Sequence, residues 1–358
     1  MRRKWIIGIG VALIGLALVA TGGRTWLAQR LFDRALDRGV GVDQSARLGD
    51  GLHAYVCGSG SPLPDADRAG PCIAVLAGQQ AFVFDVGSGA TRKLLRMGFP
   101  IEKLQGAFLT HLHSDHFDGL GELLLQAWIG GSRATPLPIH GPTGVDQVVG
   151  GFASAYAIDR GFRIAHHGEK VANPAGYGGV AQTIALADGA DAQVVYDQGG
   201  VKITAIRVNH APVAPAFGYR VDYKGRSLAL SGDTVYAPGF VSAASGVDVM
   251  FHEAMNKAMV AAMGAKMAER GHANTAKIMG DIQGYHSSPD DAARAAQGAG
   301  AKLLVLYHLV PAPPVRLIEP LFLGNAASQF HGPIRIARDG LLISLPAGSS
   351  DVRTSNAL

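Results

Sequence analysis

Histidine and aspartate side chains are concentrated in one short stretch of the chain, Thr110-His111-Leu112-His113-Ser114-Asp115-His116-Phe117-Asp118-Gly119. Three imidazoles and a carboxylate within the six residues from His111 to His116 are costly to bury unless they bind a cation. Neutral imidazole and carboxylate are ligands that Zn²⁺ prefers. The stretch follows an apolar strand-like run (residues 107–109) and precedes a helical pattern, so we expect a loop at the carboxyl end of a strand. The spacing therefore predicts a metal site in this loop.

Three further candidate ligands occur where other predicted strands end. His210 follows a strand predicted at residues 203–208, Asp233 follows one at 227–230, and His308 follows one at 303–307. Each alone could be a capping or core polar group. Because the chain already carries the histidine cluster, their shared position favours additional ligands at the same edge of the fold.

The elements that must position these residues alternate along the chain. Several predicted strands are continuously apolar, which indicates sheets covered by helices. This alternation predicts a layered α/β domain over residues 45–345, followed by a polar tail at 346–358. The predicted strands span residues 52–56, 73–77, 81–84, 106–109, 194–196, 202–208, 227–230, 247–251, 302–307 and 334–343. The predicted helices span residues 91–97, 120–129, 145–157, 256–269 and 289–298.

Composition excludes some classes of protein. The chain has 358 residues, of which 48% are hydrophobic and 17% charged, so it is neither a disordered tail protein nor a disulfide-stapled miniprotein. The sequence pI of about 9.1 invites a nucleic-acid interpretation. However, three of the four net positive charges come from Arg2, Arg3 and Lys4. Most of the net charge therefore belongs to the predicted export signal.

The amino terminus has the composition of an export signal. A basic stub precedes the uncharged run of residues 5–20, which predicts a signal peptide or signal-anchor within residues 1–30. We therefore expect an exported protein, either periplasmic or anchored to the inner membrane facing the periplasm.

Cys57 and Cys72 flank a Gly/Ser/Pro-rich loop. In an oxidising compartment, a disulfide there would stabilise the fold by roughly 2–4 kcal/mol. Two unlinked thiols are the alternative.

Taken together, these residues resemble the metallo-β-lactamase superfamily of binuclear metallohydrolases. The resemblance extends from about residue 52 to 311 and is closest to the branch that contains ribonuclease Z and the zinc-type arylsulfatases. It implies a four-layer αββα sandwich with the metal site at one edge, between two β-sheets. The supporting strings are Gly58-Ser59-Gly60-Ser61-Pro62, Phe84-Asp85-Val86-Gly87, Phe217-Gly218-Tyr219-Arg220, Ser231-Gly232-Asp233-Thr234, Phe251-His252-Glu253-Ala254 and Tyr285-His286-Ser287-Ser288.

The resemblance implies two Zn²⁺ per chain, with Mn²⁺ or Fe²⁺ as possible substitutes. A carboxylate bridge would keep the two ions about 3.5–4 Å apart, so that they share an attacking hydroxide. Asp115 would also orient this hydroxide or take its proton. The implied ligands are His111, His113 and His210 for the first ion, Asp115, His116 and His308 for the second, and Asp233 as the bridge.

Outside the ligand set, the resemblance implies that His286 faces the substrate as a proton donor or as a clamp on the transition-state oxygens. Glu253 would orient His286, and His252 is expected to be structural. The His166-His167 pair is a candidate for the mouth of the pocket. The remaining histidines are expected to be structural: His53, His140, His272 and His331.

The implied activity is hydrolysis of small anionic esters, either phosphodiesters or aryl sulfates. A ribonuclease Z-like tRNA 3′-processing endonuclease is the alternative, but residues 171–200 lack Lys and Arg and contain three Asp, and an exported protein would not meet tRNA. The string Tyr307-His308-Leu309-Val310-Pro311 also favours the arylsulfatase type. Nucleic acid is therefore an unexpected partner, and the amino-terminal segment is a candidate membrane contact.

The resemblance leaves three more functions open. The same fold also accommodates a β-lactamase or lactonase, a non-catalytic metal-binding scaffold and a di-iron redox protein. The oligomeric state is not specified by the sequence.

Overall fold

The computed structural model describes the backbone of residues 2–358 and the side chains of residues 21–358. The chain divides into a unit that ends at Gln44 and a second unit, Ser45–Leu358. The first unit contains helix α1 (Arg2–Gly39). The apolar run assigned to an export signal (residues 5–20) lies outside the residues whose side chains are described. Within the described part of the chain, no helix combines the length and the apolar character needed to cross a membrane.

The second unit contains an eight-stranded sheet, which we call sheet A. Its strand order is β15-β14-β1-β2-β3-β4-β5-β6. β1, β2 and β3 are antiparallel neighbours, whereas β3, β4, β5 and β6 run parallel to one another. The strands are β1 (Gly51–Gly58), β2 (Cys72–Ala77), β3 (Gln80–Phe84), β4 (Leu104–Phe108), β5 (Leu137–Gly141), β6 (Gly179–Thr183), β14 (Leu341–Pro346) and β15 (Arg353–Asn356).

A seven-stranded sheet, sheet B, faces it with the order β13-β12-β11-β10-β9-β8-β7. β7 to β10 are antiparallel, and β10 to β13 are parallel. The strands are β7 (Ala192–Gln198), β8 (Val201–His210), β9 (Val213–Tyr223), β10 (Arg226–Leu230), β11 (Val249–Met255), β12 (Leu303–Val310) and β13 (Ile334–Ile336).

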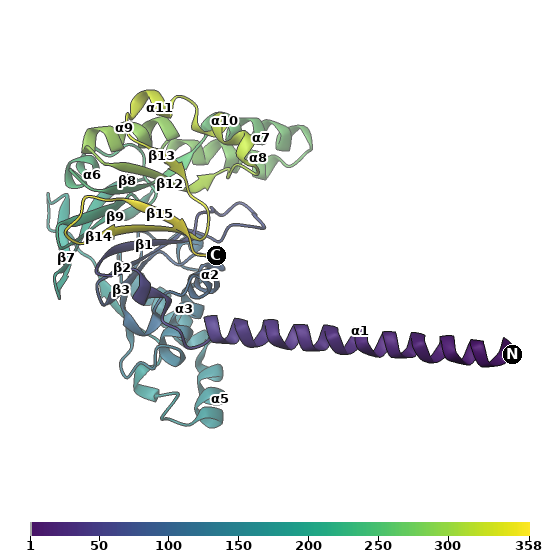
Figure 1. The fold of residues 1–358 in the computed structure, drawn as a ribbon. Helices are drawn as coiled ribbons and strands as arrows, with labels where there is room; N and C mark the ends of the chain where they lie inside the picture. The colour runs from purple at the N-terminus through teal and green to yellow at the C-terminus, as the bar shows by residue number, and fades with distance from the viewer. Residues whose placement is uncertain (1) are drawn as a thin grey trace. The chain divides into compact units, whose positions relative to one another are not determined.

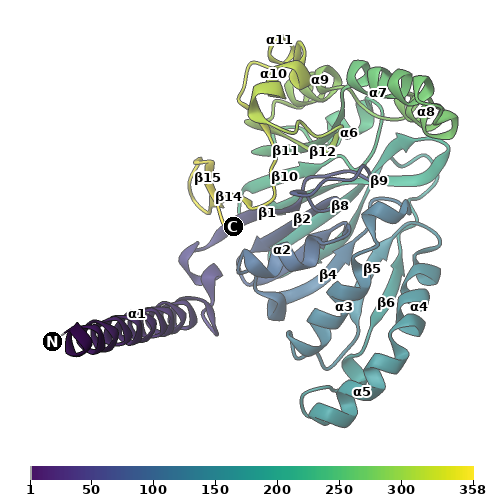
Figure 2. The same cartoon turned by 90° about the vertical axis from the view of Figure 1, so that its right-hand side faces the viewer.

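Helices cover the outer faces of both sheets (Figures 1 and 2). On sheet A they are α2 (Ala90–Arg96), α3 (Leu120–Ile129) and α4 (Val145–Ala155), with α5 (Ala157–His167) following α4. On the sheet B side they are α6 (Pro238–Ala243), α7 (Lys257–Glu269), α8 (Ala273–Asp281), α9 (Pro289–Ala299), α10 (Glu319–Leu323) and α11 (Ala326–Gln329). The 3₁₀ helices are η1 (Gln44–Arg47), η2 (Ile101–Lys103), η3 (Ser114–His116), η4 (Pro174–Gly176), η5 (Ile282–Gly284) and η6 (Arg316–Ile318).

Three apolar layers hold these elements together. Between the sheets, Phe82 and Phe108 of sheet A are buried with Tyr219 of sheet B. The outer face of sheet A packs against helices through side chains such as Leu123. The outer face of sheet B packs against the alanine-rich helix α9. Burying each large apolar side chain contributes roughly 1.5–3 kcal/mol. The αββα sandwich expected from the sequence is confirmed.

One predicted strand is divided in the structure. Residues 334–343 form β13 in sheet B and β14 in sheet A, because Gly340 adopts φ +95° between them and the chain changes sheet. Within the predicted polar tail (residues 346–358), β15 pairs with β14. These two differences place β13, β14 and β15 at one end of the sandwich.

Candidate metal centre

The loop after β4 carries the histidine cluster and is fixed by a buried carboxylate. Asp85, just after β3, accepts hydrogen bonds from the backbone N–H of Thr110 (2.8 Å) and from the Thr110 hydroxyl (2.9 Å). Oδ2 of Asp85, the oxygen that accepts the Thr110 hydroxyl, also lies 2.8 Å from Nδ1 of His116. Asp85 itself has φ +54°. The ends of β3 and β4 are therefore tied together directly beneath the cluster.

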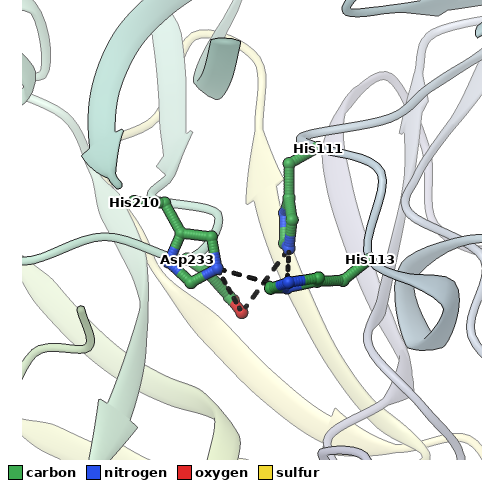
Figure 3. A group of neighbouring side chains, drawn as sticks. All are labelled: His111, His113, His210 and Asp233. Atoms are coloured by element: carbon green, nitrogen blue, oxygen red, sulfur yellow. Dashed lines mark hydrogen bonds and ion pairs between the residues drawn. The ribbon is translucent and has the colours of Figure 1, made fainter. Parts of the chain in front are cut away.

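The first group of candidate ligands combines both sheets. His111 Nε2 lies 3.0 Å from His113 Nδ1, and His210 Nε2 lies 3.3 Å from the same atom. Asp233 Oδ2 is 3.8 Å from His111 Nε2 and 3.9 Å from His210 Nε2. Figure 3 shows the three rings and the carboxylate turned toward a common point.

The second group contains Asp115, His116 and His308. Asp115 Oδ2 is 3.6 Å from His116 Nε2 and 3.3 Å from His308 Nε2. Asp233 Oδ2 lies 3.3 Å from His116 Nε2 and 3.4 Å from His308 Nε2. One oxygen of Asp233 therefore faces imidazoles of both groups, which is the position that a bridging ligand requires.

The strand ends of sheet B bring the distant residues into place. His210 is the last residue of β8, and Asp233 follows β10. In the pairing of β11 with β12, Glu253 lies opposite Tyr307 and Ala254 lies opposite Leu309. His308 is thus the extra residue of a β-bulge, with φ +45°. A bulge redirects a side chain that a regular strand would point elsewhere.

Hydrogen bonds outside the groups fix which ring nitrogens are available. Nδ1 of His210 lies 3.0 Å from the carbonyl oxygen of Tyr285, which can only accept, so Nδ1 donates and Nε2 keeps its lone pair. Nδ1 of His116 donates to Asp85 in the same way. Nε2 of His116 and Oδ1 of Asp233 are buried and have no hydrogen-bond partner among the described residues. These unpartnered atoms suit a cation held at the centre of the site.

The electrostatics agree with this donor set. Burial and the neighbouring His116 lower the pKa of His111 well below its ordinary value, so its ring is neutral, as a ligand must be. Burial raises the pKa of Asp233, but His308 and His116 outweigh it and hold that pKa well below the usual range. Burial lowers the pKa of His116, yet Asp233 and Asp85 raise it well above its ordinary value. The carboxylates therefore favour positive charge here.

A second carboxylate–imidazole pair lies beside the two groups. His286 Nδ1 is 3.0 Å from Glu253 Oε1 and 3.9 Å from Asp233 Oδ2. Glu253 Oε1 also accepts the backbone N–H of Thr234 and of Ser287. Burial lowers the pKa of His286, but Glu253 raises it to about 9. At neutral pH both nitrogens of the His286 ring are therefore protonated, and the ring is positively charged.

Hydrogen bonds of the residues that directly follow His286 fix the position of this loop. The Ser287 hydroxyl donates to the carbonyl oxygen of Thr234. Immediately afterwards, Ser288 and Asp291 form a capping box at the start of α9, with Pro289 in the first turn. His286 Nε2 has no hydrogen-bond partner within the described part of the chain, which leaves this nitrogen free for another molecule.

The remaining histidines do not join the site. His252 is buried, with Nδ1 2.8 Å from the carbonyl oxygen of Glu253. His53 lies 3.3 Å from the carbonyl oxygen of Gly49, and His140 stacks on Phe108. His166 and His167 are exposed in the last turn of α5, and His272 and His331 are exposed as well.

Sequence reasoning did not assign a role to Asp85 or Thr110. The only signal for Asp85 was its position at the end of β3 in the string Phe84-Asp85-Val86-Gly87.

Cys57 and Cys72 are joined by a disulfide between the carboxyl end of β1 and the first residue of β2. This bridge closes the loop that contains Ser59.

Comparison with known proteins identifies relatives of this chain. The sequence model of the Beta-lactamase superfamily domain matches residues 82–309. Ribonuclease Z of Mycobacterium avium is 37% identical over 290 residues, which cover 80% of this chain and 96% of that protein. Ribonuclease Z of Mycobacterium marinum is 36% identical with the same coverage. The human short-form tRNase Z structure superposes with a TM-score of 0.57 at 22% identity, covering 82% of this chain and 99% of that one, and this likeness shows the fold.

These relatives correct three sequence-based predictions. The expectation that nucleic acid is not a partner is wrong, because the similar proteins are named for RNA cleavage. The expectation of an exported, periplasmic or membrane-anchored protein is contradicted by the same relatives. The signal behind that expectation was compositional, a basic stub followed by the uncharged run of residues 5–20. The arylsulfatase type is not supported.

Proposed function

The chain belongs to the metallo-β-lactamase superfamily, within its ribonuclease Z branch, and on this premise we propose that it is a metal-dependent phosphodiesterase that cleaves RNA, as a tRNA 3′-processing endonuclease. The observation that carries the proposal is the convergence of seven donor side chains in two groups that share the carboxylate of Asp233. A hydrolytic role is further supported by the protonated ring of His286 beside them.

We assign the seven side chains as ligands of two divalent cations, with Zn²⁺ as the preferred metal. His111, His113 and His210 would hold one ion, Asp115, His116 and His308 the other, and Asp233 would contact both. Ions bound there would polarise the phosphoryl oxygens and lower the pKa of water toward neutrality. The buried, unpartnered His116 Nε2 and Asp233 Oδ1 support this assignment.

The other side chains would handle protons around the reacting phosphorus. His286 would donate its proton to the leaving oxygen as the phosphorus–oxygen bond breaks, and Glu253 would hold the ring in position. Asp115 is the most exposed carboxylate of the group, with 16% of its side chain accessible, so it can accept a proton from the attacking water. Separate side chains would therefore serve the incoming and the leaving oxygen.

RNA binding requires positive charge near the site, and residues 171–200 provide none. Basic side chains occur in the segment that precedes residues 171–200 in the chain. Arg160 and Arg163 lie on α5, and Lys170 is exposed just beyond it. Arg163 pairs with Asp159 at 2.7 Å, so only part of this charge is available to a phosphate backbone.

The test is a measurement of bound metal followed by a substrate panel. Purified protein should hold about two divalent ions per chain by elemental analysis. It should remove the 3′ trailer of a precursor tRNA and hydrolyse bis(4-nitrophenyl) phosphate. 4-Nitrophenyl sulfate and a cephalosporin serve as controls and should remain intact. The variant H308A, which removes one ligand of the second group, should lower metal content and both activities together.

Two results would overturn the proposal. Fewer than about one tightly bound ion per chain would remove the binuclear assignment. Hydrolysis of the small phosphodiester with no cleavage of precursor tRNA would leave a phosphodiesterase but exclude the RNA substrate.

A further inference from the structure

A polar cleft of about 560 Å³ opens at the end of the sandwich where β13 meets β14 and β15. In Figure 1, β13 belongs to sheet B and β15 lies beside β14 in sheet A. Three arginines line it, together with three polar residues from β15: Arg316, Arg335, Arg338, Thr354, Ser355 and Asn356. The volume falls within the range of ligand sites, and none of these residues belongs to the candidate metal centre.

The two acidic residues of the cleft are already neutralised. Glu319 Oε1 pairs with Arg338 at 2.8 Å. Asp339 accepts the backbone N–H groups of Ser59 and Ala69 and pairs with Lys93 at 2.8 Å. Neither carboxylate therefore leaves a free negative charge in the cleft.

Two arginines remain available for a ligand. Arg316 and Arg335 are exposed, and their side chains make no hydrogen bond or ion pair with any residue that the structure describes. Behind the cleft, the buried guanidinium of Arg68 donates to the carbonyl oxygen of Ala337, and its Nη2 has no partner among the described residues. The cleft therefore carries uncompensated positive charge, which favours an anion.

The cleft lies at the same end of the molecule as the metal centre. β12 and β13 are parallel, with Leu306 opposite Ile336, so both strands run toward this end. The candidate ligand His308 follows Leu306 by two residues, and Arg338 follows Ile336 by two residues. Arg335, one of the two available arginines, lies opposite Val305 in the same pairing, three residues before His308. Free positive charge of the cleft therefore lies on the strand next to the one that carries His308.

We propose that this cleft binds the phosphodiester backbone of the RNA substrate beside the scissile bond, an inference that rests on the proposed function. Guanidinium groups bind phosphate oxygens in a bidentate manner. The hydroxyls of Thr354 and Ser355 supply further donors of the kind that contact nucleic-acid backbones. Such contacts position the substrate without reading its sequence.

The experiment measures binding of a fluorescent precursor tRNA by anisotropy, across a series of salt concentrations. The variants are R316E, R335E and the double variant, with R316Q and R335Q as milder changes. K202E is the control, because Lys202 is exposed at the start of β8, the end of that strand opposite His210, and the charge change is the same. Each cleft reversal should weaken binding about 5- to 10-fold at low salt and reduce the salt slope by about one. K202E should bind within about 2-fold of the wild-type protein.

Cleavage assays separate this inference from the proposed function. Hydrolysis of bis(4-nitrophenyl) phosphate should be unchanged in all cleft variants, which also shows that they fold. Unchanged RNA affinity and salt slope in the double variant would overturn the cleft while leaving the function intact. RNA binding that depends on the arginines without RNA cleavage would support the cleft and overturn the function.

Discussion

Two buried carboxylate–imidazole pairs flank the candidate metal centre, and they differ in what the second ring nitrogen meets. In the sheet A pair, Asp85 engages Nδ1 of His116, and Nε2 then faces two more carboxylates, Asp115 and Asp233. In the sheet B pair, Glu253 engages Nδ1 of His286, and Nε2 has no hydrogen-bond partner among the described residues. The same pairing therefore prepares one ring to bind a cation and the other to deliver a proton.

Asp233 is the group that the two pairs share, so its removal should have the largest effect. We expect D233A to lower kcat/KM about 1,000-fold, equivalent to about 4 kcal/mol in activation free energy, because both groups of candidate ligands would lose the carboxylate that they share. Bound metal should fall in parallel, as measured by elemental analysis. D197A is the control, since Asp197 is an exposed carboxylate on β7. Retention of two ions in D233A would show that Asp233 is not a bridge.

Replacing each imidazole in turn tests directly whether the two rings have different roles. H286Q should lower kcat about 100- to 1,000-fold through loss of the proton donor, with metal content unchanged. H116Q should lose metal together with activity. Loss of metal in H286Q would mean that His286 is a ligand and that the two rings do not differ in role.

The two sheets also differ in how readily their candidate site residues could be predicted from the sequence. The sheet A residues His111, His113, Asp115 and His116 form one contiguous string, so residue type and spacing were enough to predict a site. Asp85 was missed because its contact joins positions 31 residues apart, and only the adjacent ends of β3 and β4 create it. Local spacing carries no information about such a contact.

On sheet B, the candidate ligands were found from the rule that strand ends converge. His210, Asp233 and His308 could be predicted this way, although the β-bulge that turns His308 inward could not. The arginine cleft was not predicted, because it depends on the division of residues 334–343 between two sheets. The amino-terminal composition suggested export, but composition does not show where a chain acts.

The carboxylate behind each ring can be removed while the ring is kept. D85N should weaken metal affinity about 10- to 100-fold, because the hydrogen bond that orients His116 and increases its basicity is lost. Competition with a metal chelator measures this change. E253Q is the matched control and should leave metal affinity within about 2-fold, since its partner ring is outside the ligand groups. Equal losses in both variants would remove the distinction between the pairs.

The smallest effect concerns the pH dependence of the sheet B pair. Burial lowers the pKa of His286, and Glu253 overrides this to raise it to about 9. The protonated donor is therefore present below that pH and is lost above it, so kcat of the wild-type protein should fall as pH rises through about 9. In E253Q, burial and His116 lower the pKa of His286 and Asp233 alone raises it, so the pKa falls and the alkaline limb of the kcat profile should move to lower pH. The difference between the two proteins should be smallest at the acidic end of the profile, where protonation of His286 is most complete in both. An alkaline limb at the same pH in both proteins would show that His286 does not supply the proton, and H286Q should lack the limb altogether.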